Sequence, residues 1–397
     1  MANNQLLTQN FFRHVAQTSN DPMGIPIDHA EGMYVYASDG KKYIDLVAGI
    51  SVCNMGHSHP AIVKAVQEQV AKYMHVMVYG EVIQQPQVEL ATLLCSFLPQ
   101  ELSTAFFVNS GSEAVEGGLK LAKRATGRRE IIHCNHAYHG CTHGAMSVMG
   151  CDSFRHAFEP LLPNTRAIRF GVEEDLKLIT DKTACFIVEP VQGEGGIQTA
   201  DKPYWQAVRK RCTETGTMLI FDEIQTGLGR TGKLFAFEHY DIKPDILLLA
   251  KALGGGLPLG AFIASSQIME LLTHNPALGH ISTFGGHPVS CAAALAHLKL
   301  ITDNKIWEHV EEKGQALENI FRQLPNIKEI RRKGLMMALD FKDSVYCLKM
   351  DKKFLEIGLL TDWFLFCDSA LRIAPPLIIS EKEIQEIDHI IKQKLIE

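Results

Sequence analysis

The clearest pattern in the chain is a series of short, almost wholly apolar runs in its middle. They occupy residues 105–108 (AFFV), 184–188 (ACFIV), 218–221 (MLIF) and 245–250 (DILLLA). The runs lack the polar alternation of a half-exposed strand, and helical stretches separate them. They therefore predict strands of a mostly parallel sheet that is covered on both faces.

Amphipathic helical patterns lie between and around these runs. Residues 112–127 and 202–216 each end in glycine, which commonly ends a helix. Pro60 precedes apolar residues at four-residue spacing, so we expect it to begin a helix. Near the C-terminus, Ser380 and Glu383 form a capping-box pattern before a helix with one apolar face.

The last hundred residues differ from the middle, with longer charged helical patterns such as residues 306–324. We therefore expect an α/β protein with a large central domain and a smaller domain made from both termini. The predicted boundaries give residues 1–56 and 296–397 to the small domain and residues 57–295 to the large domain.

Composition narrows the class of protein. The 397 residues are 46% hydrophobic and 21% charged, with a net charge of -6, as in an ordinary α/β protein. No basic stripe suggests nucleic acid, and no apolar run reaches signal-peptide or membrane-spanning length. The ten cysteines are spaced like reduced thiols. We expect a cytoplasmic protein without a nucleic-acid or membrane partner.

The segment HCNHAYHGCTH, residues 133–143, raises the question of a metal site because it holds four histidines and two cysteines. Its spacing matches no common zinc pattern, since the chain has no Cys-x-x-Cys and the segment has no His-Glu-x-x-His. Asn135, Gly140 and Thr142 argue against a continuous helix. We expect a strand, a turn and then a helix, and no metal; a hydrolytic metal enzyme would depend on this segment alone.

Polar residues follow the predicted strands at the positions where parallel sheets bind ligands. Taken singly, each has an ordinary structural explanation as a cap or a solvated side chain. Together they bring a helix N-terminus, carboxylates, an amide and an amine to one crevice. Pyridoxal phosphate needs such a set, because its aldehyde takes an amine, its pyridine nitrogen a carboxylate and its phosphate several donors. The segments are 109–113, 189–194, 222–225 and Lys251.

The sequence also resembles the class III pyridoxal-phosphate-dependent aminotransferases of fold type I, which include acetylornithine, ornithine and 4-aminobutyrate enzymes. The resemblance runs over nearly the whole chain. It implies a large domain with a mostly parallel seven-stranded sheet and a smaller α+β domain formed by both termini. The motifs that carry it are GISVCNMGHSHP (49–60), NSGSEAVEGGLKLAKR (109–124), AYHG (137–140), EPVQGEGG (189–196), IFDEIQTGLGRTGKLFAFEH (220–239), PDILLLAKALGGGLPLGA (244–261) and STFGGHP (282–288).

The resemblance implies the catalytic groups. Lys251 would hold the cofactor as a Schiff base and later move a proton at the substrate carbon, which requires a partly desolvated amine of lowered pKa. Asp222 would pair with the pyridine nitrogen, and Gln225 would hydrogen-bond the ring hydroxyl.

The other implied cofactor contacts come from three segments. Gly111 and Ser112 would bind the phosphate at a helix N-terminus, and the ring of Tyr138 would stack on the pyridine. Thr283 matches the residue that reaches the phosphate of a neighbouring subunit. The resemblance therefore implies a homodimer, or a higher oligomer, with shared active sites.

On the substrate side, Arg372 matches the arginine that binds a substrate carboxylate. Glu194 matches the acid that neutralises this arginine when the substrate is an ω-amine, and Glu189 would lie in the same wall. A structural role for Arg372 near the domain junction is the alternative.

The main departure from the family pattern is Cys141, which stands where acetylornithine and ornithine enzymes have an arginine for the distant carboxylate. A cysteine is neutral and too short to replace this arginine, so the sequence does not identify the amino donor of the reaction. Compensation by His139, His143, Arg155 or a residue of the partner chain is an open alternative. A smaller departure is His287, where asparagine is frequent.

We therefore expect an aminotransferase that moves an amino group from an amino acid or ω-amine (ornithine, acetylornithine, 4-aminobutyrate or similar) to an oxo acid such as 2-oxoglutarate or pyruvate. An aminomutase, decarboxylase or racemase of the same fold is the alternative, because the same lysine and aspartate serve all of them. A catalytically silent homologue would not need the proton-shuttling amine. A nicotinamide dehydrogenase fits worse, because no Gly-x-Gly-x-x-Gly follows an early strand.

Overall fold

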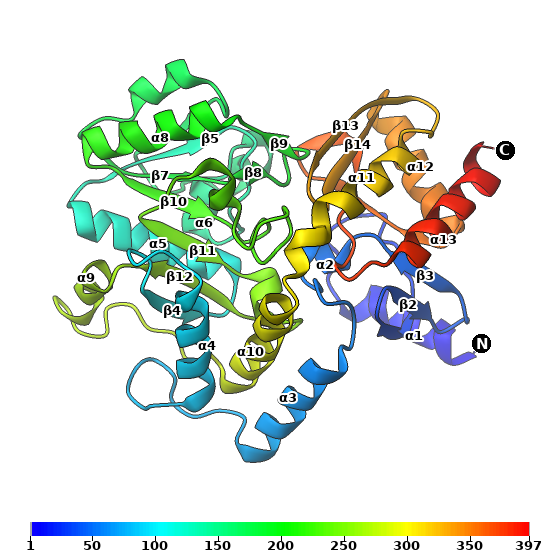
Figure 1. Cartoon of the computed structure of the whole chain (residues 1–397), viewed down its shortest axis with the longest axis horizontal. Coiled ribbons are helices and arrows are strands. Elements are labelled where there is room, and N and C mark those ends of the chain that lie inside the picture. The colour runs from blue at the N-terminus through cyan, green and yellow to red at the C-terminus, as the bar shows by residue number, and fades with distance from the viewer. Residues whose placement is uncertain (1, 397) are drawn as a thin grey trace.

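A seven-stranded sheet forms the centre of the larger part of the computed structural model, which describes residues 2–396 (Figure 1). β12 is antiparallel to both its neighbours, and the other neighbouring pairs are parallel. The predicted mostly parallel sheet is confirmed. In spatial order its strands are β4 (Thr104–Val108), β12 (Gly260–Ala264), β11 (Ile246–Leu249), β10 (Met218–Asp222), β7 (Thr183–Val188), β5 (Glu130–Cys134) and β6 (Thr165–Ile168).

Helices cover both faces of this sheet and end where the sequence predicts. Gly127 and Gly216 follow α5 and α8 with φ values of 68° and 65°, a left-handed conformation that glycine adopts without a steric penalty. Pro60 begins α3, and the side chain of His59 caps it. The longer helices of this part are α3 (Pro60–Lys72), α4 (Gln85–Ser96), α5 (Gly111–Thr126), α8 (Lys202–Thr215) and α10 (Pro288–Asp303).

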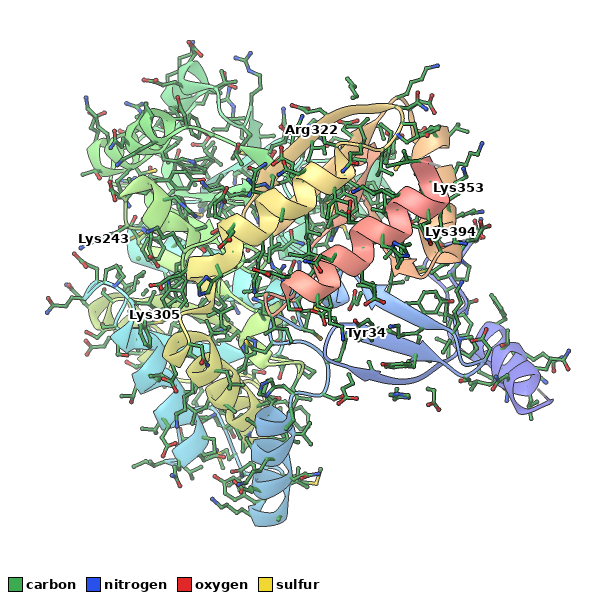
Figure 2. The ribbon with its side chains drawn as sticks, turned by 45° about the vertical axis from the view of Figure 1, so that its right-hand side comes forward. Tyr34, Lys243, Lys305, Arg322, Lys353 and Lys394 are labelled. Atoms are coloured by element: carbon green, nitrogen blue, oxygen red, sulfur yellow. The ribbon has the colours of Figure 1, made fainter. Side chains whose placement is uncertain are left out.

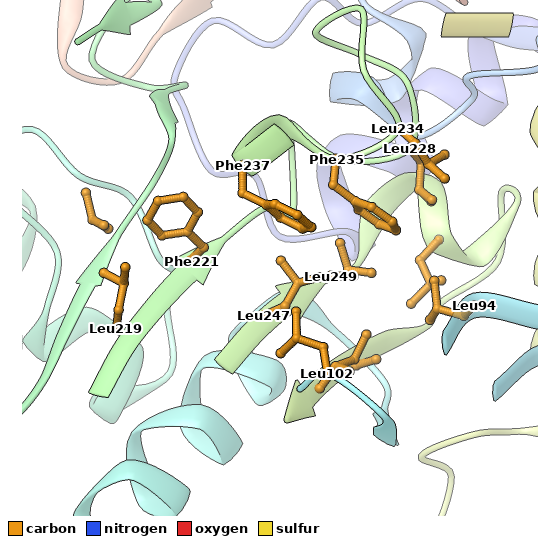
Figure 3. Close-up of a cluster of buried hydrophobic side chains, with 14 of the residues drawn as sticks. Leu94, Leu102, Leu219, Phe221, Leu228, Leu234, Phe235, Phe237, Leu247 and Leu249 are labelled. Carbon is orange, nitrogen blue, oxygen red and sulfur yellow. The ribbon is translucent and has the colours of Figure 1, made fainter. Parts of the chain in front are cut away.

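The core of the larger part divides according to the two faces of the sheet. Leu219 and Phe221 of β10 lie on the same face as Leu247 and Leu249 of β11 (Figure 3), because alternate residues of a strand point the same way. The residues between them, such as Leu248, belong to a second cluster under α5. Both faces are apolar because both are covered.

The smaller part is built from both ends of the chain, as predicted. Figure 1 shows the blue N-terminal strands beside the orange and red C-terminal elements. One sheet contains β1 (Ile27–Glu31), β2 (Tyr34–Ala37), β3 (Lys42–Asp45) and β15 (Leu359–Leu360), and the other contains β13 (Ile327–Lys333), β14 (Met336–Phe341), β17 (Cys367–Ile373) and β16 (Asp362–Phe364). The helices here are α1 (Ala2–His14), α11 (Val310–Phe321), α12 (Ser344–Glu356) and α13 (Glu381–Ile391).

Direct contacts join the two ends of the chain. The hydroxyl of Tyr34 on β2 donates to Glu386 of α13 at 2.8 Å, and Figure 2 shows Tyr34 beside this helix. Ile44 and Leu46 share one buried cluster with residues from 310 to 391. The boundaries at residues 57 and 296 stay a prediction, and α10 runs across the second of them.

A buried arginine connects the two parts. Arg230 follows β10 and donates to Asn54 Oδ1 at 2.6 Å, to the carbonyl of Leu335 at 3.1 Å and to the carbonyl of Pro375. These partners come from three segments of the smaller part, so Arg230 helps to fix it over the strand ends. Among residues 2–396, no helix is both long enough and apolar enough to cross a membrane.

Candidate active site

A cavity of about 360 Å³ lies at the carboxyl ends of β7, β10 and β11. Because polar residues follow these strands, the cavity is lined by side chains from distant parts of the sequence. Eight of the predicted site residues meet here: Gly111, Ser112, Tyr138, Glu189, Glu194, Asp222, Gln225 and Lys251.

A second cavity of about 290 Å³ adjoins the first, toward the smaller part. Tyr138, Glu194 and Lys251 line both cavities, and the predicted Arg372 lines the second. Lys251 therefore lies where the two cavities meet.

The backbone conformation of Lys251 is unusual. It is the first residue of η4 (Lys251–Gly254), with φ 46°, a left-handed conformation that costs a non-glycine residue roughly 1–3 kcal/mol. Burial lowers the pKa of Lys251, while the carboxylate of Glu194 opposes this shift. A lysine of lowered pKa is neutral more often, so its amine can react as a nucleophile or accept a proton.

Asp222 is held by His139, a residue considered above only as a substitute for the missing arginine. His139 Nδ1 lies 2.7 Å from Asp222 Oδ2, and both side chains are buried. The backbone N–H of Ile224 donates to the other oxygen at 3.0 Å. His139 is therefore engaged with Asp222 and does not replace the missing arginine. Its position directly after Tyr138, in the loop that follows β5, was the available signal.

The N-terminus of α5 forms one wall of the first cavity. Ser110 caps the helix by accepting from the backbone N–H of Glu113 at 3.2 Å. Ser112 Oγ accepts from the backbone N–H of Cys141 at 3.2 Å. Gly140 passes so close that an added Cβ would lie 2.1 Å from Ser112 Oγ, and its φ is +124°. A glycine at position 140 is thus required for the loop after β5 to approach the N-terminus of α5 this closely.

Tyr138 and Glu189, which also line the first cavity, are joined by a hydrogen bond. The backbone N–H groups of Tyr138 and Gly193 each donate to Glu189, both at 2.9 Å. Burial raises the pKa of Glu189 to about 7. The hydroxyl of Tyr138 lies 3.1 Å from the sulfur of Cys141. The residue that departs from the family pattern therefore contacts the predicted stacking residue.

Arg372 and Glu194 form a closed ion pair in the second cavity. Arg372 Nη2 lies 2.7 Å from both carboxylate oxygens of Glu194, and the two residues are 2% and 7% exposed. The backbone N–H of Leu365 donates to Glu194 at 3.1 Å, and the ring of Phe364 lies 4.8 Å from the guanidinium. The structure thus brings together the two residues that the resemblance paired.

Two elements of the second cavity were not anticipated from the sequence. One is the hairpin of β16 and β17, which contributes Asp362 and Trp363. The other is the turn at Gly49 and Ile50, whose φ values of 61° and 63° are left-handed. The motif GISVCNMGHSHP marked this turn without revealing its conformation.

The histidine-rich segment forms the predicted strand, turn and helix, from β5 to α6 (His143–Ser147). Its histidine side chains lie in different surroundings. Burial lowers the pKa of His133 to about 3, whereas His139 contacts Asp222. His143 and Arg155 line neither cavity in the part of the chain that the structure describes. Across residues 2–396, no group of three or more His, Cys, Asp or Glu side chains could hold a metal.

Thr283 lies outside both cavities of its own chain, as far as the described residues show. It is exposed, and its carbonyl lies 2.8 Å from His75 Nε2. Large apolar side chains nearby in sequence are also exposed, including Ile281 (51%) and Phe284 (55%). This segment therefore lies on the surface of the single chain.

Known proteins of one family are similar to this chain over nearly its whole length. The model of the aminotransferase class-III family matches residues 15–395. Acetylornithine aminotransferases of Methanocaldococcus jannaschii and Methanopyrus kandleri are 43% and 41% identical, each over 90% of both chains. The structure is similar to an ornithine aminotransferase from Toxoplasma gondii, with a TM-score of 0.91 and 29% identity over 99% of this chain and 94% of that one. An acetylornithine aminotransferase from Elizabethkingia anophelis is also similar, with a TM-score of 0.84 and 30% identity over 99% and 98% of the chains. The chain belongs to the class III aminotransferase family.

Proposed function

We propose that this chain is a pyridoxal-phosphate-dependent aminotransferase that works by two half-reactions, with Lys251 as the lysine that binds the cofactor. The observation that carries the proposal is the place of Lys251, which lines both cavities on a strained backbone. Its amine can therefore reach a cofactor on one side and a substrate on the other.

The first cavity fits pyridoxal phosphate in size and in lining. Its volume of about 360 Å³ is typical of small-molecule sites. The α5 N-terminus offers backbone N–H groups to a phosphate at Gly111 and Ser112, and the buried carboxylate of Asp222 suits a protonated ring nitrogen. The similar ornithine aminotransferase from Toxoplasma gondii contains the same cofactor at partial occupancy.

Within this cavity, each residue would have one task. When bound, pyridoxal phosphate withdraws electrons from the carbon that carries the transferred amino group. Asp222 would keep the ring nitrogen protonated, and His139 would fix the orientation of Asp222. Tyr138 would cover the ring, while Gln225 would hydrogen-bond its hydroxyl.

Lys251 would also move the proton. Because its pKa is lowered by burial, the released amine can take a proton from the donor carbon and return it at a neighbouring atom.

The pair of Arg372 and Glu194 would distinguish the two substrates. While the pair is closed, the arginine is neutralised, and an ω-amine donor without a nearby carboxylate can enter. If Glu194 moves away, Arg372 is free to bind the carboxylate of an oxo acid such as 2-oxoglutarate or pyruvate. Ornithine, acetylornithine and 4-aminobutyrate are the donors suggested by the family.

We also propose a homodimer with shared active sites. Thr283 does not reach the cavity of its own chain, and exposed apolar residues adjoin it. Burial of these residues against a second copy would remove apolar surface from water and could deliver Thr283 to the partner's phosphate site. The ten cysteines, all within the described residues, are unpaired, which supports a cytoplasmic location.

The two half-reactions can be tested separately. Purified protein loaded with the cofactor should convert one equivalent of an amine donor to its carbonyl product without any oxo acid. Addition of 2-oxoglutarate or pyruvate should then give one equivalent of glutamate or alanine and restore the original absorbance. Release of carbon dioxide, or an isomerised donor without loss of its amine, would contradict transamination.

A further inference from the structure

One carboxylate of the second cavity makes no ion pair among the described residues. Four side chains with formal charge line it: Glu194, Asp362, Lys251 and Arg372. Glu194 and Arg372 neutralise one another at 2.7 Å, and Lys251 is committed to the cofactor under the proposed function. Asp362 is left as a carboxylate that forms no ion pair within the part of the chain that the structure describes.

Asp362 is held at the cavity by the β-hairpin. It lies opposite Arg372 in the register of β16 and β17, on the sheet that carries the arginine into the site. Among the described residues, the carboxylate of Asp362 accepts one hydrogen bond, from the backbone N–H of Trp363 at 2.9 Å. Arg372, although close, makes its ion pair with Glu194 instead, so Asp362 keeps hydrogen-bonding capacity for a ligand.

Trp363 also lines the cavity that Asp362 lines, and it is 38% exposed. An aromatic ring attracts an ammonium group that lies close to its face. Burial raises the pKa of Asp362, and a bound cation would lower it again. Cys141, which stands where acetylornithine and ornithine enzymes have an arginine, supplies no positive charge for a distant carboxylate.

We propose that Asp362 and Trp363 form a cation subsite, and that the preferred amino donor is a short α,ω-diamine whose unreacted ammonium binds there. This inference rests on the proposed function and specifies its donor. One terminal amine would react beside Lys251 while the other stays at Asp362. Overall, that amine and the oxo group of the acceptor exchange places, which gives an amino aldehyde and an amino acid.

The test compares three donors of equal chain length that differ at the far end: 1,5-diaminopentane, 1-aminopentane and 5-aminopentanoate. The rate at which each donor changes the visible absorbance of the bound cofactor is measured against donor concentration, without oxo acid. Wild-type protein should react with the diamine at a concentration at least about tenfold lower than with either analogue, since a charged hydrogen bond is lost in both.

Asp362→Asn should raise the diamine concentration needed for the half-maximal rate about tenfold or more, with little change for 1-aminopentane. Asp368→Asn is the matched control, because Asp368 is an exposed aspartate of the same hairpin that does not line the cavity. Trp363→Leu provides a second variant at a more exposed position. It should raise the diamine concentration needed for the half-maximal rate several fold.

Two results would overturn the inference. If wild-type protein reacts with 1-aminopentane as readily as with the diamine, or prefers 5-aminopentanoate, the subsite does not select a cation and the aminotransferase proposal stands. If no amine changes the absorbance of the loaded protein, both proposals fail together.

Discussion

The hydrogen bond between His139 and Asp222 can be tested with two substitutions that differ mainly in one donor. His139→Leu removes the ring nitrogen that lies 2.7 Å from the carboxylate, whereas His139→Asn keeps a nitrogen near the position of Nδ1. Both residues of the pair are buried, at 2% and 4% exposure, so water has little access to the position of the lost donor.

The expected difference follows from the bonds that remain. Among residues 2–396, the carboxylate of Asp222 would keep only the backbone N–H of Ile224 as a donor, at 3.0 Å. A hydrogen bond to a charged group contributes about 1.5–3 kcal/mol, and a buried acceptor without its donor is costly. His139→Leu should therefore lower the free energy of unfolding by about 2 kcal/mol relative to His139→Asn.

Denaturant unfolding of the cofactor-free variants measures this difference. A second readout is retention of the cofactor, followed by visible absorbance during dialysis, because a misplaced Asp222 would hold the ring nitrogen poorly. Should the leucine and asparagine variants unfold at the same denaturant concentration and retain the cofactor equally, the proposed positioning role of His139 would be wrong.

Three further substitutions test other parts of the site. Gly140→Ala should abolish cofactor retention, because its Cβ would lie 2.1 Å from Ser112 Oγ; Gly127→Ala, also at positive φ but in open space, should cost only about 1 kcal/mol and leave retention unchanged. Burial raises the pKa of Glu189 from 4.5 to about 7, so between these values the folded chain keeps a proton that the unfolded chain has lost, and stability falls as the pH rises. The free energy of unfolding of Glu189→Gln minus that of wild type should thus become more positive by up to about 3 kcal/mol from pH 4.5 to 7, and a pH-independent difference would contradict this assignment. Glu194→Ala should cost about 3–5 kcal/mol in denaturant unfolding because it leaves a buried guanidinium without its partner, and a variant as stable as wild type would refute the closed pair.

The parts of the fold that the sequence predicts well are those with local signals. The strands β7 and β10 are continuous apolar runs, and Gly127 and Gly216 end their helices through a local backbone requirement. The meeting of Asp222 and Lys251 was also predictable, because parallel strands place their carboxyl ends at one edge of the sheet. The roles assigned to these residues stay predictions.

The parts that were missed depend on contacts between distant segments. His139 and Asp222 are far apart in sequence. The place of His139 directly after Tyr138 indicates only that it lies near the first cavity, and no local pattern shows that its ring contacts Asp222. Asp362 reaches the second cavity because β16 pairs with β17, and the backbone of Leu365 in the same hairpin donates to Glu194. Such long-range packing leaves no periodic pattern in a single sequence.

The most direct test of the account is to find the lysine that binds the cofactor. Reduction of the loaded protein with borohydride, followed by peptide mass spectrometry, locates the covalent attachment without any assumption about the donor. We predict attachment at Lys251, and loss of both the attachment and the visible band in Lys251→Arg. Attachment at another lysine, or none in a protein that binds the cofactor, would contradict the central claim.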